Sequence, residues 1–123
     1  RIGWVTGSAY EWVQHWRVGP GLGAPADDLL AVRDWRTSDR FGAPERAVLA
    51  ATDDVLRDGR ISAQTWRECE EALGADEPAL VELVCAIGGW HMISVILESL
   101  EVPLEDGLEP WPPDGVAPEG VTL

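Results

Sequence analysis

The chain has 123 residues, of which 46% are hydrophobic and 25% are charged, so its composition is that of a globular protein in water. It carries 22 acidic residues against nine arginines and no lysine, which gives a formal net charge of -13. Nucleic acid and anionic lipid both repel such a chain, so we expect no nucleic-acid partner and no membrane partner. The length fits one domain with a core of its own.

The two cysteines, Cys69 and Cys85, belong neither to a C-x-x-C motif nor to a zinc-binding spacing. This usage predicts free thiols, a reducing cytoplasmic compartment and no bound metal. Glutamates around Cys69 oppose thiolate formation, and Cys85 is predicted to lie in the core. The least polar stretch, residues 83–97, contains His91 and Ser94 and is shorter than the roughly 20 apolar residues that a membrane-spanning helix needs.

The first five residues look like the end of a helix already under way, so we expect further helices before residue 1. A glycine break follows, and a helix is predicted from Ala9 to Val18. Ser8 precedes this helix and Glu11 comes three residues later, which is the spacing of a capping box. Pro20, between two glycines, ends the helix.

Four more helices are predicted from proline starts, serine caps and glycine stops, and no strand pattern occurs. The last of them is apolar over most of its circumference, which predicts that it is buried. Gly88 and Gly89 in its middle leave room for another backbone to approach closely. The predicted ranges are 25–35, 44–57, about 63–73, and 78–100.

These patterns predict an all-α fold, an antiparallel helical bundle over residues 1–100. An extended, acidic, proline-rich and partly mobile tail is expected over residues 101–123, with Trp111 among the side chains that can pin its first half. The long apolar helix needs more cover than five short helices from one chain provide. We therefore expect subunits to share a core.

Glu11 and His15 lie one turn apart on the predicted helix 9–18, so their side chains share a face and come within hydrogen-bonding reach. A histidine titrates near neutral pH, and a neighbouring carboxylate can orient its ring. We expect His15 to be the catalytic acid and base, with Glu11 as its orienting partner. Two structural readings stay open: Glu11 completes the capping box, and His15 is a core histidine bonded to a backbone carbonyl.

Aromatic and polar side chains near this pair can line a pocket for a planar substrate. The predicted substrate-binding residues are Tyr10, Trp12, Trp90 and His91. The three aromatic residues fit a packed core as well, and His91 fits a contact between subunits. Arg17 points roughly away from His15, so it is not assigned to a substrate carboxylate.

The order of these motifs resembles the carboxymuconolactone decarboxylase and alkyl hydroperoxidase D-like superfamily of small helical oligomers. The resemblance spans nearly the whole chain and implies a bundle of that superfamily's type. It rests on GSAYEWVQH at 7–15, ERAVL at 45–49, IS followed by TW at 61–66, LVELV at 80–84, the segment 88–92, and VPL at 102–104.

The peroxidase branch of this superfamily carries C-x-x-C-x-x-x-H at the start of the same helix. The matching positions here are Ser8, Glu11 and His15, so dithiol peroxidase chemistry is not available at this site. The Y-E-W-x-x-H form resembles the decarboxylase branch, whose members act on a carboxylated lactone without metal or redox cofactor. The resemblance implies a cofactor-independent carboxy-lyase for a small carboxylated or lactone-type substrate, assembled as a trimer or hexamer.

Two other functions stay open from the sequence. The first is peroxidase or other thiol redox activity, for which Cys69 and Cys85 are the only thiols. The second is a helical module without catalysis that binds a ligand or scaffolds an assembly. It is favoured if Glu11 is engaged in capping and no cavity opens beside His15.

Overall fold

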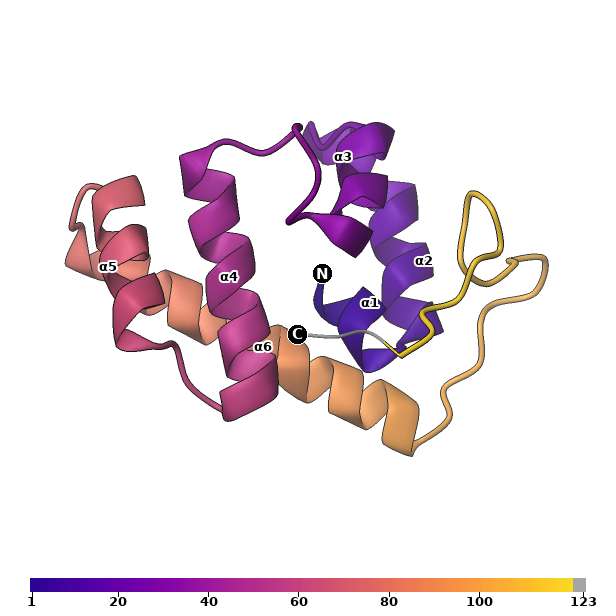
Figure 1. Cartoon of the computed structure of the whole chain (residues 1–123). Coiled ribbons are helices and arrows are strands. Elements are labelled where there is room, and N and C mark those ends of the chain that lie inside the picture. Colours follow the sequence, from indigo (N-terminus) through magenta and orange to yellow (C-terminus); the bar gives the residue numbers. More distant parts are fainter. Residues whose placement is uncertain (121–123) are drawn as a thin grey trace.

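The computed structural model describes residues 1–120, and every element of regular structure in that range is a helix (Figure 1). This confirms the all-α class that the sequence predicted. Six α-helices and two short 3₁₀ turns follow one another along the described part of the chain. Their bounds are α1 Ile2–Thr6, α2 Ala9–Val18, η1 Gly19–Leu22, α3 Ala26–Ala31, η2 Val32–Asp34, α4 Ala43–Asp58, α5 Ala63–Ala72 and α6 Glu77–Ser99.

Helix α6 joins two groups of helices (Figure 1). Helices α4 and α5 pack against each other at one end, while α1, α2 and α3 gather at the other. Helix α6 runs along both groups and contacts α1, α2 and α4. The predicted ranges 9–18, 44–57 and 78–100 agree with α2, α4 and α6 to within one residue at each end, and the predicted helix 25–35 is divided between α3 and η2.

The junction between α1 and α2 differs from the predicted capping box. Gly7 adopts a left-handed conformation with φ 78°, and its N–H and the N–H of Ser8 both donate to the carbonyl of Gly3. The Ser8 hydroxyl is buried and has no hydrogen-bond partner among the described residues. The prediction is wrong here because the Ser8 amide already donates to the end of α1 and is not free to donate to the Glu11 carboxylate. At α5, by contrast, the Ser62 hydroxyl does cap the helix by accepting from the amide of Thr65 at 3.2 Å.

Two apolar clusters form the core. The larger one lies between α4, α5 and α6, with Ile2 of α1 at its edge, and its buried members are Ile2, Ala47, Ala51, Cys69, Leu80, Leu83 and Ile87. The smaller one is aromatic and brings Trp111 against Trp4 and Trp12, with ring centroids 5.7 and 6.3 Å away. Trp12 also donates its indole N–H to the carbonyl of Pro112 at 2.8 Å. These contacts pin the segment after α6 to α1 and α2.

Residues 101–120 contain no helix or strand and pass beside α1 and α2 (Figure 1). Arg33 donates to Asp114 at 2.8 Å and lies over the rings of Trp4 and Trp12, 4.5 and 4.8 Å from their centroids. Such cation–π stacking adds to the burial of Trp111 in holding this segment in place. The last three residues of the predicted tail, 121–123, lie outside the described range.

Helix α6 departs most from its predicted environment. Only Leu80, Leu83, Ile87 and Ser94 are buried along it, because neighbouring helices contact one side alone. Cys85 is exposed, so both the prediction that α6 is buried all round and the prediction of a core Cys85 are wrong for the single chain. Among the described residues, α6 is the one helix whose length and composition would allow it to cross a membrane.

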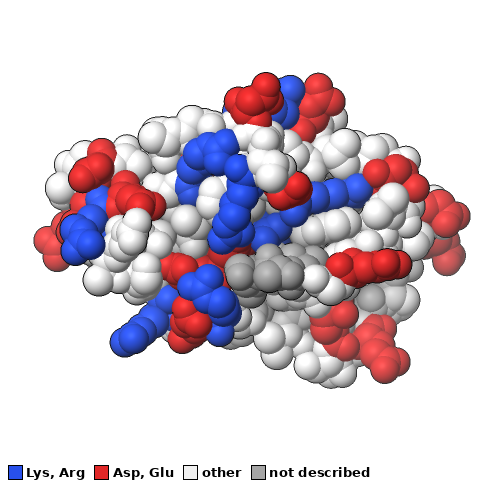
Figure 2. Space-filling model, viewed as in Figure 1, with Lys and Arg blue, Asp and Glu red and all other residues white. Residues whose placement is uncertain are grey.

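Charge is distributed unevenly along the chain. All nine arginines lie within residues 1–67, so α6 and the segment after it carry acidic side chains and no arginine or lysine. Figure 2 shows arginines gathered across the middle of one face, with carboxylates toward its ends.

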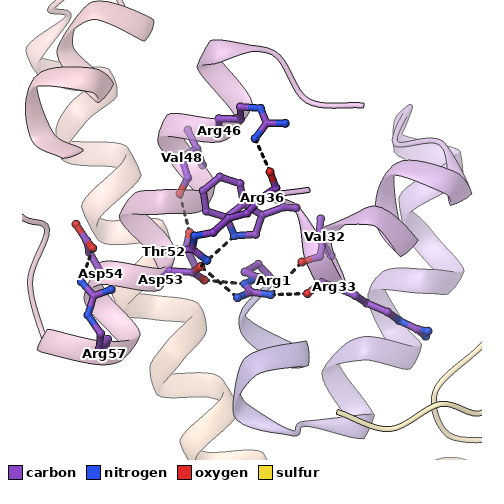
Figure 3. Close-up of polar contacts among 11 residues, drawn as sticks. Arg1, Val32, Arg33, Arg36, Arg46, Val48, Thr52, Asp53, Asp54 and Arg57 are labelled. Carbon is purple, nitrogen blue, oxygen red and sulfur yellow. Dashed lines mark hydrogen bonds and ion pairs between the residues drawn. The ribbon is translucent and has the colours of Figure 1, made fainter. Parts of the chain in front are cut away.

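A buried ionic cluster links the two groups of helices (Figure 3). The carboxylate of Asp53 on α4 is fully buried and accepts from the side chains of Arg1, Trp35 and Arg36 at 2.5 to 3.1 Å. A buried carboxylate is tolerated only when charged donors and hydrogen bonds surround it, as they do here. The neighbouring Asp54 turns the other way and accepts from Arg57 and from the amide of Ser62.

Candidate active site

Glu11 lies at the centre of a buried polar chain drawn from three helices. Its side chain on α2 is 4% exposed, and its Oε2 accepts a hydrogen bond from the hydroxyl of Ser94 on α6, which is fully buried. The Ser94 oxygen lies 3.2 Å from the hydroxyl oxygen of Thr6 on α1. These hydrogen bonds hold the Glu11 carboxylate in an apolar interior, where one of its two oxygens accepts from a single hydroxyl.

Close packing of α1 on α2 fixes this carboxylate. An added Cβ at Gly3 would lie 3.2 Å from the amide nitrogen of Trp12 and 3.3 Å from the Cβ of Glu11. Glycine at this position therefore lets α1 approach α2 beside Glu11. Gly3, Thr6 and Ser94 were not among the predicted site residues. A hydroxyl inside the least polar stretch of the chain was the available signal for Ser94.

The imidazole of His15 bonds a backbone carbonyl, as the structural alternative predicted, although the ring is exposed and does not lie in the core. Its Nδ1 lies 2.8 Å from the backbone carbonyl oxygen of Glu11, and the Glu11 carboxylate is turned toward Ser94. A carbonyl oxygen can only accept, so Nδ1 carries the proton and Nε2 of the neutral ring holds the lone pair. The predicted Glu11 to His15 side-chain pair is corrected: the helix backbone orients the imidazole, and α6 supplies the partner of the carboxylate.

Trp90 packs edge-on against the imidazole. The two ring centroids are 4.9 Å apart and the ring planes meet at 74°, a favourable T-shaped arrangement. His15 is exposed and Trp90 is 47% exposed, so the pair lies at the surface end of the site. Trp90 therefore limits rotation of the imidazole ring and leaves part of the ring exposed.

Two cavities meet at Glu11, His15 and Trp90. The inner cavity, about 290 Å³, opens between α1, α2, α3 and α4, and the outer cavity, about 300 Å³, lies between α2 and α6. The inner walls are largely apolar: Ile2, Trp12, Trp16, Leu29, Val32, Val48 and Leu49. The outer walls add Tyr10, Gln14, Val18, Ile93 and Leu97.

The predicted substrate-binding residues divide between these cavities. Trp12 lines the inner one, Tyr10 the outer one and Trp90 both, whereas His91 lines neither. Tyr10 donates its hydroxyl to Glu105 at 3.0 Å, and this hydrogen bond raises the pKa of the phenol. Trp12 also belongs to the aromatic cluster, so its packing role and its place in the cavity wall coexist.

One arginine lines the inner cavity, but its donors are used elsewhere. The guanidinium of Arg1 bonds through each of its three nitrogens: to both oxygens of Asp53 and to the carbonyls of Val32 and Arg33. Arg17 donates to Gln14 at 3.1 Å and lines neither cavity.

No thiol lines either cavity. Burial raises the pKa of Cys69, with further contributions from Glu68 and Asp54, and its Sγ lies 3.5 Å from the carbonyl of Ala47. Cys85 is exposed on α6. Residues 1–120 also contain no cluster of three or more histidine, cysteine or acidic side chains placed to hold a metal ion.

No family model, curated protein or solved structure matches the chain.

Proposed function

We propose that the chain is an acid–base enzyme that moves a proton at the carbon next to the carbonyl of a small lactone-type or carboxylated molecule. The observation that carries this proposal is the placement of His15. Its Nδ1 is occupied by the Glu11 carbonyl, which leaves Nε2 as the reactive nitrogen, and the ring lines an apolar cavity. At about 290 Å³ that cavity is just below the roughly 300 to 1,000 Å³ typical of ligand pockets.

The proton transfer is balanced within the site. Nε2 of His15 takes a proton from the carbon next to the carbonyl, and the electron pair moves onto the carbonyl oxygen to form an enolate. The imidazolium then returns a proton to carbon. A substrate that carries a carboxylate on this same carbon reaches the same enolate by losing carbon dioxide. No proton leaves the carbon in that route, so the proton that quenches the enolate comes from the imidazolium form of His15, which afterwards takes up a proton from water. A positioned acid or base of this kind contributes on the order of 10² to 10⁴ in rate.

The motif order is the second support for this proposal. It resembles the decarboxylase branch of the carboxymuconolactone decarboxylase and alkyl hydroperoxidase D-like superfamily at Tyr10, Glu11, Trp12 and His15, and it lacks the C-x-x-C pair of the peroxidase branch. On this proposal the helices form a bundle of that superfamily's type and the reaction needs no cofactor. The absence of a cavity-lining thiol argues against redox chemistry at this site.

Deuterium exchange with 2-coumaranone tests the proposal, because this small neutral lactone has an acidic C–H next to its carbonyl. Nuclear magnetic resonance in D₂O follows loss of that C–H signal above the buffer rate. We expect His15→Ala to lower the catalysed rate by about 10² or more, because the general base is removed. His91→Ala is the matched control, since His91 is the other histidine and lines neither cavity.

Full catalysis by a folded His15→Ala protein, judged by its circular dichroism, would contradict the role of His15. Loss of exchange in a Cys69→Ser, Cys85→Ser double variant would instead favour thiol chemistry.

A helical ligand-binding module without catalysis is the second candidate. One observation favours it: the Glu11 carboxylate bonds Ser94 and leaves His15 without a carboxylate partner. Binding of 2-coumaranone with no exchange above buffer would support this candidate over the enzyme.

A further inference from the structure

We infer that the inner cavity selects uncharged, flat ligands and rejects carboxylates. This inference deepens the proposed function by choosing the lactone over the acid, and its catalytic consequence rests on that function. Its basis is the set of charged groups that face the cavity.

Among the side chains that line the inner cavity, Glu11 alone is acidic. Glu11 presents a buried carboxylate whose single side-chain partner is the neutral hydroxyl of Ser94. Apolar walls surround it, so a second carboxylate in the cavity would meet both like-charge repulsion and the loss of its hydration. The chain's overall charge of -13 adds to this repulsion.

Arg1 does not compensate for this charge. It is the one arginine in the wall of either cavity, and its side chain is 5% exposed. Two of its nitrogens bond Asp53, and the third bonds two backbone carbonyls. A ligand carboxylate would have to break the Asp53 pair to reach this guanidinium, which would leave a buried aspartate without its partner.

The walls fit a neutral ring instead. Trp12, Trp16 and Trp90 contribute aromatic side chains to the lining, and aromatic walls favour flat apolar ligands. His15 and Glu11 are the polar groups at the point where the cavities meet. A carbonyl-bearing bicyclic molecule would place its ring among the tryptophans and its polar edge at His15.

The test compares 2-coumaranone with 2-hydroxyphenylacetate, its ring-opened product, which differs by one water and one negative charge. Tryptophan fluorescence titration of each probe at the same pH gives the two affinities. We expect the lactone to bind at least tenfold more tightly than the carboxylate. Glu11→Gln keeps an acceptor for Ser94 and removes the charge, so it should narrow the ratio by raising the affinity of the carboxylate. Glu82→Gln removes the same charge from an exposed site on α6 and should leave the ratio unchanged.

The outcomes distinguish failure of the proposed ligand selection from failure of the proposed proton transfer. Tighter binding of 2-hydroxyphenylacetate, or of neither probe, would overturn the selection of neutral ligands. An unchanged ratio in Glu11→Gln would also overturn it. Selective binding of the lactone with no deuterium exchange would uphold the ligand class and overturn the proposed proton transfer.

We also propose that a second copy of this chain docks on the outer side of α6. A stripe of apolar and small residues at helical spacing faces away from the other helices: Val81, Val84, Gly88, Met92 and Val95. Its four large members are 43% to 57% exposed, and Ile96 and Leu100 extend the patch with 44% and 71% exposed. A chain that stays monomeric rarely exposes a contiguous apolar patch of more than a few hundred Å².

The lack of basic residues disfavours an anionic bilayer as the occupant, which leaves a second copy of this chain. Helix α6 and the segment that follows it contain no arginine or lysine, so they lack the basic flanks that draw a helix to anionic lipid. Helix α6 is also held along its other side by α1, α2 and α4. An added Cβ at Gly88 would meet no atom within 4 Å, so a partner helix can approach the backbone closely there. A two-fold pairing of these patches is self-complementary.

Light scattering during size-exclusion chromatography tests this docking. We expect the chain to elute at twice its monomer mass or more at tens of micromolar, and Val84→Glu with Met92→Glu to elute as a monomer with unchanged helical circular dichroism. Leu22→Glu, at an 83% exposed position in η1, is the control and should leave the mass unchanged. A monomeric parent chain, or unchanged assembly in the α6 double variant, would overturn the proposal. Co-sedimentation of the parent chain with phosphatidylcholine vesicles would show that lipid covers this face instead, and would also overturn it.

Discussion

Asp53 and Glu11 are both almost fully buried carboxylates, but their surroundings differ in kind. Asp53 accepts from two guanidinium groups and an indole, so both of its oxygens are engaged (Figure 3). Glu11 accepts from one neutral hydroxyl on one oxygen and lines both cavities. The first arrangement neutralises a charge and joins helices. The second places an acidic side chain with a single hydroxyl partner beside two cavities, which is costly for folding and useful for recognition or chemistry.

The largest expected effect is at Asp53. Asp53→Asn keeps the size of the side chain and removes the charge, which leaves Arg1 with a side chain 5% exposed and no anion. Breaking one partner of a buried ion pair costs about 3 to 5 kcal/mol. Urea unfolding followed by circular dichroism should therefore show a large drop in the free energy of unfolding. A loss below about 1 kcal/mol would mean that the cluster is not a structural clamp.

Ser94→Ala disrupts the surroundings of Glu11 and should lower the free energy of unfolding by less than Asp53→Asn does. It removes the hydroxyl that donates to Glu11, and an unsatisfied buried polar group costs about 1 to 3 kcal/mol. The same unfolding measurement on Ser99→Ala, an exposed serine at the end of α6, gives the control and should stay within about 0.5 kcal/mol of the parent. Equal values for the two variants would show that Ser94 does not support Glu11.

Asp54 should make an intermediate contribution to the free energy of unfolding, and the dependence of that free energy on pH can measure it. Burial alone would raise the pKa of Asp54, but hydrogen bonds from Thr65, Ser62 and Arg57 outweigh it and lower the pKa from the usual 3.8 to about 2. A lowered pKa stabilises the fold at pH values above 3.8, and that contribution is lost as the pH falls toward 2. It amounts to about 2 kcal/mol by linkage. The free energy of unfolding should fall less steeply between pH 4 and pH 2 in Asp54→Asn than in the parent, and identical slopes would contradict this role.

The smallest expected effect on stability is at His15. Its side chain is exposed, bonds the carbonyl of its own helix and packs on Trp90, so His15→Gln should change the free energy of unfolding by less than about 1 kcal/mol. Differential scanning calorimetry measures this directly. A loss of more than 1 kcal/mol would give the imidazole a structural role and weaken its assignment to chemistry.

Local signals predicted the helices well because their causes lie within a few residues. The range 9–18 followed from the breaks at Gly7 and Pro20, and it agrees with α2. The Ser62 cap was predicted from the position of this serine just before the helix expected at about 63–73, and it is present. Ser8 also stands just before a helix, but its hydroxyl does not cap α2, and its amide bonds back to Gly3 in α1. Whether a serine caps a helix depends on the hydrogen bonds that the preceding residues already make. A pattern within a few residues does not show these bonds.

The sequence by itself determined that the chain is helical, where its helices begin and end, and that Glu11 and His15 share a turn, since these follow from local periodicity and capping. The direction each side chain takes was decided only by the tertiary structure. The Glu11 carboxylate turns toward α6 because it accepts a hydrogen bond from Ser94, which lies 83 positions after Glu11. The free imidazole nitrogen, the two cavities and the exposed side of α6 all depend on such distant packing, which no pattern within one helix contains.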